Sequence, residues 1–120
     1  MKYLLIISII FFKVSEEPAI KFNLKQHHYI VRVGETLKQK ISFTNVGTNS
    51  LIIKDISSTC TCTVGYFSKE AILPNKMGYI DITFHSKGKM LGIQTQPLII
   101  EINSTNKKFK KLNIEFEIIQ

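Results

Sequence analysis

A chain of 120 residues, of which 44% are hydrophobic and 21% charged, has the size and composition of one packed globular domain. Its formal net charge of +7 comes almost entirely from lysine, because Arg32 is the only arginine. Sequence-specific readers of nucleic acid favour the bidentate arginine side chain, so nucleic acid is not an expected partner and most lysines are expected on a solvated surface.

The first residues have the pattern of a secretory signal peptide. Lys2 precedes an uncharged, largely apolar run over residues 3–12, and Lys13 follows that run. A basic start followed by about ten apolar residues is typical of an export signal, whereas a membrane-spanning helix needs about 20 residues. The alternative is a buried strand, but the unbroken apolar run does not alternate as a half-exposed strand does. We therefore expect a signal peptide over residues 1–15, no transmembrane span, and export to the periplasm or the cell surface.

From residue 16 onward the sequence predicts strands rather than helices. Apolar and polar residues alternate with a period of two, and turn formers such as Gly, Asn and Pro separate the alternating segments. The segments cover residues 20–24, 29–33, 37–43, 51–56, 80–84, 98–102 and 112–118. Their spacing is typical of an immunoglobulin-like β-sandwich, so residues 16–120 are expected to form a single all-β domain of about seven antiparallel strands.

The same alternation predicts which side chains form the core. Apolar positions that share one face of a strand should lie between the two sheets. These positions are Ile41, Phe43, Ile80, Ile82, Phe84, Leu98, Ile100, Leu112, Ile114 and Phe116. Lys54 and Asp55 break the alternation of their segment, which indicates a β-bulge or a strand end.

Several short segments occur in an order that resembles a known bacterial family. They are ISFTNVG at 41–47, LII at 51–53, CTCT at 60–63, ILP at 72–74, GYIDITF at 78–84 and SKG at 86–88. The combination resembles the bacterial domain of unknown function fifteen seventy-three, which is related to the Hydin-like immunoglobulin-like domains, over residues 36–118. The resemblance implies a sandwich in an exported protein of the cell envelope, and it implies no enzymatic activity.

Two positions depart from the pattern of that family. Thr61 stands where the family usually has Gly between the cysteines, and Asn75 stands where it commonly has Gly after the loop proline. Asn tolerates the left-handed backbone conformation better than most residues, so the second change is mild. Thr is β-branched and disfavours positive φ, so a tight turn at the cysteines is less expected in this chain.

Cys60 and Cys62, the only cysteines, leave three interpretations open. In an extended strand their side chains share one face, and their Cα atoms lie near the upper limit for a disulfide, about 6.8 Å. The pair is interpreted first as structural thiols, second as a strained and labile disulfide, and third as half of a Cu or Zn site. The other candidate metal ligands are His27, His28, His85 and Met90.

The surroundings of those ligands favour a protein without a metal or other cofactor. His27 and His28 are expected in an exposed loop, and His85 is expected on the outer face of its strand. Glu115 and Glu117 also lie on an outward strand face, where we interpret them as partners of the many lysines rather than as an acid–base pair. No combination of residues indicates an enzyme.

A cluster of lysines marks the last predicted hairpin. Such a cluster is usually a solvated turn, and contact with anionic lipid or polysaccharide is the less favoured interpretation. Its members are Lys107, Lys108, Lys110 and Lys111.

The leading hypothesis is an exported, non-enzymatic module that binds a protein partner in the cell envelope or has a structural role there. Its sheet edges are the expected contact surface, because an edge strand can accept a partner strand. The alternative is an accessory protein for thiol-redox chemistry or for Cu or Zn handling, which would use Cys60 and Cys62.

Overall fold

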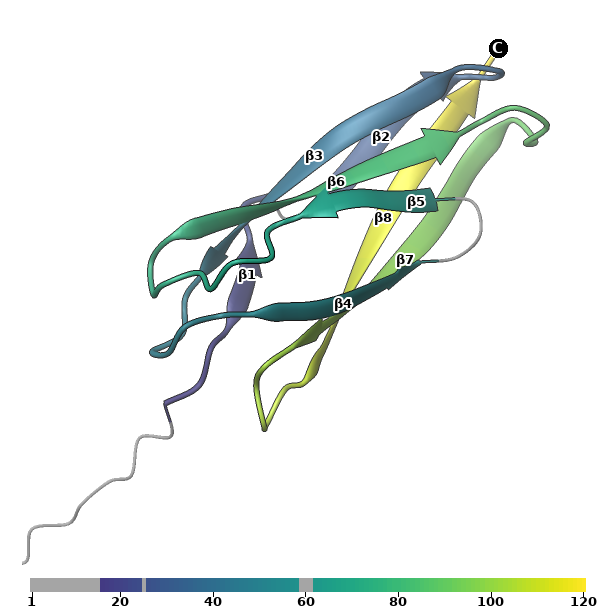
Figure 1. Ribbon diagram of the computed structural model, residues 1–120. Helices are drawn as coiled ribbons and strands as arrows, with labels where there is room; N and C mark the ends of the chain where they lie inside the picture. Colours follow the sequence, from purple (N-terminus) through teal and green to yellow (C-terminus); the bar gives the residue numbers. More distant parts are fainter. Residues whose placement is uncertain (1–15, 25, 59–61) are drawn as a thin grey trace, which may run out of the picture.

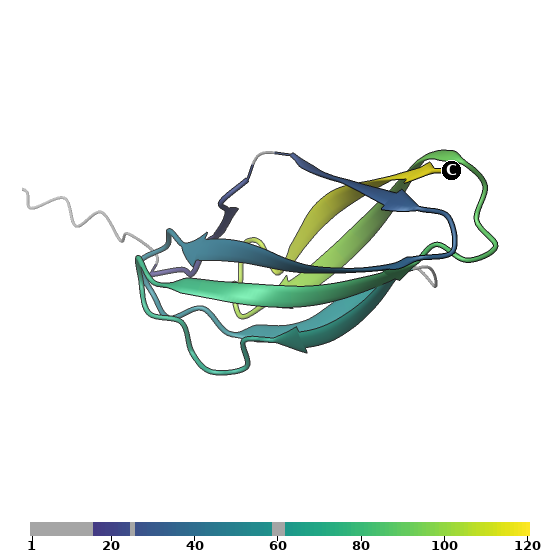
Figure 2. The ribbon, with the colours of Figure 1, turned by 90° about the horizontal axis from the view of Figure 1, so that it is seen from above.

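Eight strands form two four-stranded sheets that pack face to face (Figures 1 and 2). The computed structural model describes residues 16–24, 26–58 and 62–120, and of residues 62 and 63 it describes the backbone only. The strands are β1 (Ile20–Phe22), β2 (His27–Arg32), β3 (Thr36–Asn45), β4 (Ile53–Ser58), β5 (Cys62–Phe67), β6 (Met77–His85), β7 (Gly92–Ile102) and β8 (Phe109–Ile119). The predicted immunoglobulin-like sandwich is confirmed.

The first two strands lie in different sheets. One sheet has the order β1-β3-β6-β5, and the other has the order β2-β8-β7-β4. The neighbouring strands are antiparallel, except that β2 runs parallel to β8. The chain therefore crosses from one sheet to the other between Phe22 and His27. This crossing divides the first strand of the sandwich into β1 and β2.

The ten predicted core residues are all buried between the sheets, and none is more than 8% exposed. They come from β3, β6, β7 and β8, the strands in which the alternation of apolar and polar residues is clearest. The rings of Phe84 and Phe116 stack at the centre, with their centroids 4.0 Å apart and their planes 4° from parallel. Because Phe84 lies on β6 and Phe116 on β8, this contact joins the two sheets.

The edge strands beside β6 and β7 carry irregularities. The register of β4 shifts between Ile53 and Asp55, so the bulge predicted from the broken alternation is present. β5 is a strand that the sequence analysis did not predict, and its register shifts between Val64 and Phe67. Such bulges disturb the row of backbone groups at a sheet edge and discourage pairing with another chain.

Two local predictions have different outcomes. The turn after Pro74 closes with a hydrogen bond from the Lys76 amide to the Leu73 carbonyl, and Asn75 has a φ of 67°. Asn75 thus adopts the left-handed backbone conformation, which asparagine tolerates better than most residues.

The exposed loop predicted for the adjacent histidines His27 and His28 is wrong, because both lie in β2 and His27 is only 4% exposed. His27 faces the core because the inward positions of β2 alternate from it through Tyr29 to Val31.

Candidate functional site

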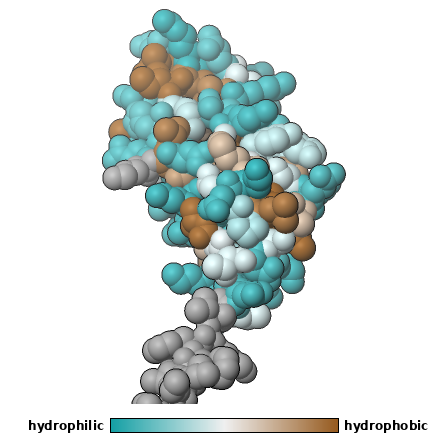
Figure 3. Space-filling model, turned by 90° about the vertical axis from the view of Figure 1, so that its left-hand side faces the viewer, coloured by the Kyte–Doolittle hydropathy of each residue, from teal (hydrophilic) through white to brown (hydrophobic). Residues whose placement is uncertain are grey.

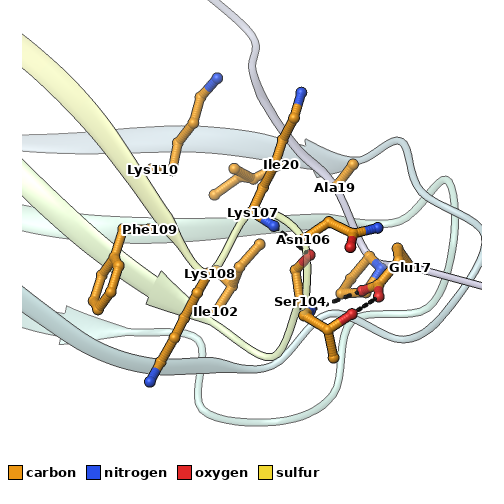
Figure 4. Close-up of a pocket in the computed structure, with 12 residues that line it drawn as sticks. Glu17, Ala19, Ile20, Ile102, Ser104, Asn106, Lys107, Lys108, Phe109 and Lys110 are labelled. Atoms are coloured by element: carbon orange, nitrogen blue, oxygen red, sulfur yellow. Dashed lines mark hydrogen bonds between the residues drawn. The ribbon is translucent and has the colours of Figure 1, made fainter.

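A groove at one end of the sandwich is the main candidate for a binding site. It lies between the segment that leads into β1 and the turn that joins β7 to β8, and its volume is about 830 Å³. Figure 4 shows side chains of the two segments facing each other across the opening. The lining residues of this β1–β8 groove are Glu17, Pro18, Ala19, Ile20, Ile102, Ser104, Thr105, Asn106, Lys107, Lys108, Phe109 and Lys110.

Hydrogen bonds at Glu17 and Ser104 hold the two sides of the groove in place. The Glu17 carboxylate accepts hydrogen bonds from the backbone amide of Thr105, at 3.1 Å, and from its hydroxyl. These bonds, the hydroxyl first, lower the pKa of Glu17 because they favour the charged form. The hydroxyl of buried Ser104 accepts a bond of 3.0 Å from the Lys107 amide, which fixes the turn. These hydrogen bonds therefore fix the shape of the groove.

The groove combines an apolar floor with a basic rim. Ile20 and Ile102 are 7% and 2% exposed, whereas Phe109 at the side is 60% exposed. The predicted lysine cluster lies on this turn and on the start of β8, and its members Lys107, Lys108 and Lys110 line the groove, whereas Lys111 does not. The Lys108 amine lies 3.4 Å from the Glu101 carboxylate and 5.5 Å from the Phe109 ring centroid. In Figure 4 the side chains of Lys108 and Lys110 extend in opposite directions.

The sequence predicts the lysines of the groove but not its other wall. Glu17 and Ile20 precede the lysines by more than eighty positions, and nothing local links the two segments. A signal was present in the three consecutive residues Glu16, Glu17 and Pro18. A proline beside a predicted edge strand limits pairing and leaves the neighbouring carboxylates free to contact another element.

The predicted lysine partners of Glu115 and Glu117 are replaced by a histidine. His28 Nδ1 lies 3.0 Å from a Glu115 carboxylate oxygen, and Nε2 lies 3.1 Å from one of Glu117. The ring thus joins β2 to β8 on the outer face of the sheet, away from the groove. Adjacent His27 is buried against Phe22, with ring centroids 6.0 Å apart, and its Nδ1 lies 3.2 Å from the Tyr29 hydroxyl oxygen.

We expect His27 and His28 to titrate on opposite sides of pH 6.5, the pKa of an unperturbed histidine. Hydrogen bonds to Glu115 and then Glu117 raise the pKa of His28. Its stabilising contribution is therefore complete below pH 6.5 and is lost as the pH rises through the folded-state pKa. Burial lowers the pKa of His27, because it disfavours the charged ring. The contribution of neutral His27 to the stability of the fold is therefore present above pH 6.5 and is lost as the pH falls through the folded-state pKa.

An NMR titration of the two imidazole rings measures both pKa values directly. The variant His28→Gln serves as the control, because it should remove the upper transition and leave the lower one in place. Equal pKa values for the two rings would contradict the contacts described for His28.

The structure describes only one residue of the cysteine pair. Cys60 lies outside the described residues, and Cys62 is the first residue of β5, where its Cα pairs with that of Phe84. Cys62 therefore does not belong to the strand predicted over residues 51–56, because that strand, β4, ends at Ser58.

The other candidate metal ligands are spread over the molecule. His85 is exposed, as predicted, and its Nδ1 lies 3.3 Å from the Thr36 hydroxyl oxygen, while Met90 is 83% exposed. Within residues 16–24, 26–58 and 62–120, no group of three or more His, Cys, Asp and Glu residues is placed to hold a metal ion. Within the same ranges, no helix has the length and apolar character needed to cross a membrane.

Exposed apolar residues also occur at the other end of the sandwich, where β2 and β8 end. Ile30 is 59% exposed, Val33 is 41% exposed and Ile119 is 36% exposed. Figure 3 shows apolar side chains gathered at the upper end of the molecule. The Val33 amide donates a hydrogen bond of 2.8 Å to the Ile119 carbonyl, so the backbone there is already paired.

Comparison with solved structures supports the fold. A protein of unknown function from Porphyromonas gingivalis W83 matches with a TM-score of 0.65 at 14% identity, over 90% of this chain and 51% of that chain. The secreted serine protease VesC from Vibrio cholerae matches with a TM-score of 0.64 at 12% identity, over 87% of this chain and 23% of that chain. This chain thus corresponds to only part of either protein, and identities this low show the fold alone.

A third structure matches over nearly its whole length. The ASH/PapD-like domain 7 of human CEP192 has a TM-score of 0.55 at 14% identity, over 86% of this chain and 85% of that chain. No curated protein matches the sequence significantly. A family model matches residues 20–118, from the first strand to the last. The chain therefore belongs to the protein family of unknown function DUF1573.

Proposed function

We propose that this chain is a non-enzymatic, Hydin-like β-sandwich module that is exported to the cell envelope and binds a protein partner there through its sheet edges. The observation that carries the proposal is the β1–β8 groove, where the two sheets part and strand edges border an apolar floor. An edge strand beside a groove can bind an extended segment, with backbone hydrogen bonds supplying affinity and the groove supplying selectivity.

The comparisons with solved structures support this proposal. The sandwich resembles part of VesC, whose name describes a secreted protease, so the fold occurs within an exported protein. The P. gingivalis and CEP192 structures resemble the same sandwich, one as half of a longer chain and one as a nearly complete domain. The binding or structural role is inferred here by analogy of fold, and the groove supplies the site.

Fractionation of cells that express the native gene tests the location. We expect the mature protein in the periplasmic or surface fraction, with an N-terminus close to residue 16. A version that lacks residues 2–15 is the control and should stay in the cytoplasm. Recovery of the native chain in the cytoplasm with Met1 intact would contradict export.

Site-specific photo-crosslinking in intact cells tests the use of a sheet edge. A photoreactive amino acid at position 111, on β8, should give a discrete protein adduct. The same group at position 95, on the outer face of the neighbouring strand β7, is the control and should give none. Equal labelling from both positions would contradict an edge-specific contact.

The thiol-redox or metal-handling alternative has one observation in its favour. β5 is the outermost strand of its sheet, so Cys62 begins a strand with no described strand beyond it. A cysteine that begins an outermost strand is placed where exchange with another thiol or a metal donor would occur.

Metal analysis and thiol counting on the native protein separate this alternative from the main proposal. We expect two structural thiols, no bound metal, and a folded Cys60→Ser/Cys62→Ser variant that is less stable by about 1–3 kcal/mol. One Cu or Zn ion per chain, together with a melting temperature that falls on chelation, would favour the alternative.

A further inference from the structure

We propose that the β1–β8 groove binds an extended, acidic segment of another protein, which adds as a strand to the first half of β8. This inference rests on the proposed function, since it assigns the surface and the partner chemistry of the same binding module. Three observations carry it: an uncovered strand edge, an apolar floor beneath that edge, and a rim of lysines around it.

The uncovered edge belongs to residues 109–113 of β8. β7 pairs with β8 from the Glu101–Phe109 pair onward, but β2 joins β8 only at the His27–Ile114 pair. The first five residues of β8 therefore have a described strand on one side only. The Ile102 amide donates a hydrogen bond of 2.8 Å to the Lys108 carbonyl. This bond shows which residues of β8 direct their backbone groups toward β7. By the alternation of antiparallel pairing, the backbone groups of Phe109, Lys111 and Asn113 point away from β7.

The crossing of the chain between the sheets creates this edge. If the first strand continued along β8, it would cover residues 109–113. Instead β1 pairs with β3 in the opposite sheet, and it does so through only three residue pairs. β1 is also the outermost strand of its sheet, so a strand edge from each sheet borders the same groove. By contrast, both outer strands on the other side of the sandwich, β4 and β5, are blunted by bulges.

The charges of the groove favour an acidic partner. Lys107 and Lys110 line the groove and are exposed, and within the described residues neither forms an ion pair. The two carboxylates nearby already have partners, because Glu17 accepts hydrogen bonds from Thr105 and Glu101 pairs with Lys108. An extended segment that alternates apolar and acidic residues would place one set of side chains on Ile20 and Ile102. The other set would lie on the outer face of β8, beside Lys111 and within reach of the positive potential of Lys107 and Lys110.

A labelled decapeptide of alternating Glu and Val residues, capped at both ends, is the probe. We expect saturable binding to the native protein by fluorescence anisotropy. The variant Lys107→Gln/Lys110→Gln should bind the peptide about tenfold more weakly, because it removes two positive charges that attract the Glu side chains of the peptide. The matched variant Lys54→Gln/Lys87→Gln removes two exposed lysines outside the groove and should bind as the native protein does. Equal weakening of both variants, or no saturation by about 1 mM peptide, would overturn the proposal.

Methylation of the peptide backbone tests strand addition separately from charge. One peptide carries N-methyl groups on every Val and a second carries them on every Glu. The amides of one set face β8 and those of the other face solvent, so we expect one peptide to lose binding and the other to keep it. Unchanged binding of both peptides would overturn strand addition. Phosphatidylglycerol vesicles that bind the native protein and displace the peptide would identify the groove as a lipid contact instead.

The outcomes distinguish this inference from the proposed function. An exported protein that crosslinks at position 111 but does not bind the acidic peptide contradicts the partner chemistry alone. A cytoplasmic protein that binds the peptide contradicts the envelope location alone.

Discussion

The variant Phe84→Ala is expected to lower the free energy of unfolding by about 3–5 kcal/mol. Phe84 is completely buried, and its ring stacks on that of Phe116 with centroids 4.0 Å apart. Truncation removes apolar burial and leaves a cavity between the two sheets, where the β6 and β8 backbones are held by their own ladders and cannot collapse fully. Urea unfolding monitored by circular dichroism measures the loss.

Two further variants show whether the stacking contact is responsible. Phe109→Ala removes a side chain that is 60% exposed at the groove, so it should change stability by less than about 1 kcal/mol. Phe84→Ala combined with Phe116→Ala should cost less than the sum of the single changes, because the two rings share one contact. A Phe84→Ala variant that is no less stable than Phe109→Ala would contradict the described core.

The core was predictable because burial in a sandwich follows a period of two, and the long strands keep that period without interruption. In β6 and β8 the residues that face inward are apolar at successive alternate positions, from Ile80 to Phe84 and from Leu112 to Ile118. β5 lacks this signal because Gly65 and a register shift interrupt it, and an edge strand with a bulge has no continuous buried face. The pattern of the sequence therefore predicts the central strands better than the edge strands.

The β1–β8 groove was not predictable for a different reason. Its lysines occupy one hairpin and are visible in the sequence, whereas its shape depends on the crossing between Phe22 and His27. Such a crossing depends on tertiary packing, so the local alternation of apolar and polar residues does not predict it. A polar residue at position 27 indicates a loop in the sequence, but packing against Phe22 and the contact with the Tyr29 hydroxyl allow it to be buried.

The variant Asn45→Ala is expected to lower the free energy of unfolding by about 2–4 kcal/mol, because it removes four hydrogen bonds made by one completely buried side chain. Asn45 is completely buried at the end of β3. Its amide nitrogen donates to the Asn49 and Ile72 carbonyls, each at 2.8 Å. Its side-chain oxygen accepts from the Gly47 amide at 3.0 Å and from the Ala19 amide at 3.3 Å. Alanine can replace none of these four contacts.

The contact of Asn45 with Ala19 also connects the core to the groove, because Ala19 lines the groove directly before β1. Gly47 adjoins the same segment so closely that a Cβ there would lie 2.3 Å from the Glu17 carbonyl oxygen. The variant Asn45→Ala should therefore disturb the wall that carries Glu17 and Ile20. Within any fraction that stays folded, we expect weaker binding of the acidic peptide.

Two other asparagines provide graded controls for this prediction. Asn103 is half-buried and makes two comparable bonds, with the Ile52 amide at 2.8 Å and the Ser50 carbonyl at 3.0 Å, so Asn103→Ala should have a smaller effect. Asn106 is exposed, and Asn106→Ala should change stability by less than about 0.5 kcal/mol. Unfolding by urea ranks the three variants. If Asn45→Ala were no more destabilising than Asn103→Ala, the four-bond role of Asn45 would be wrong.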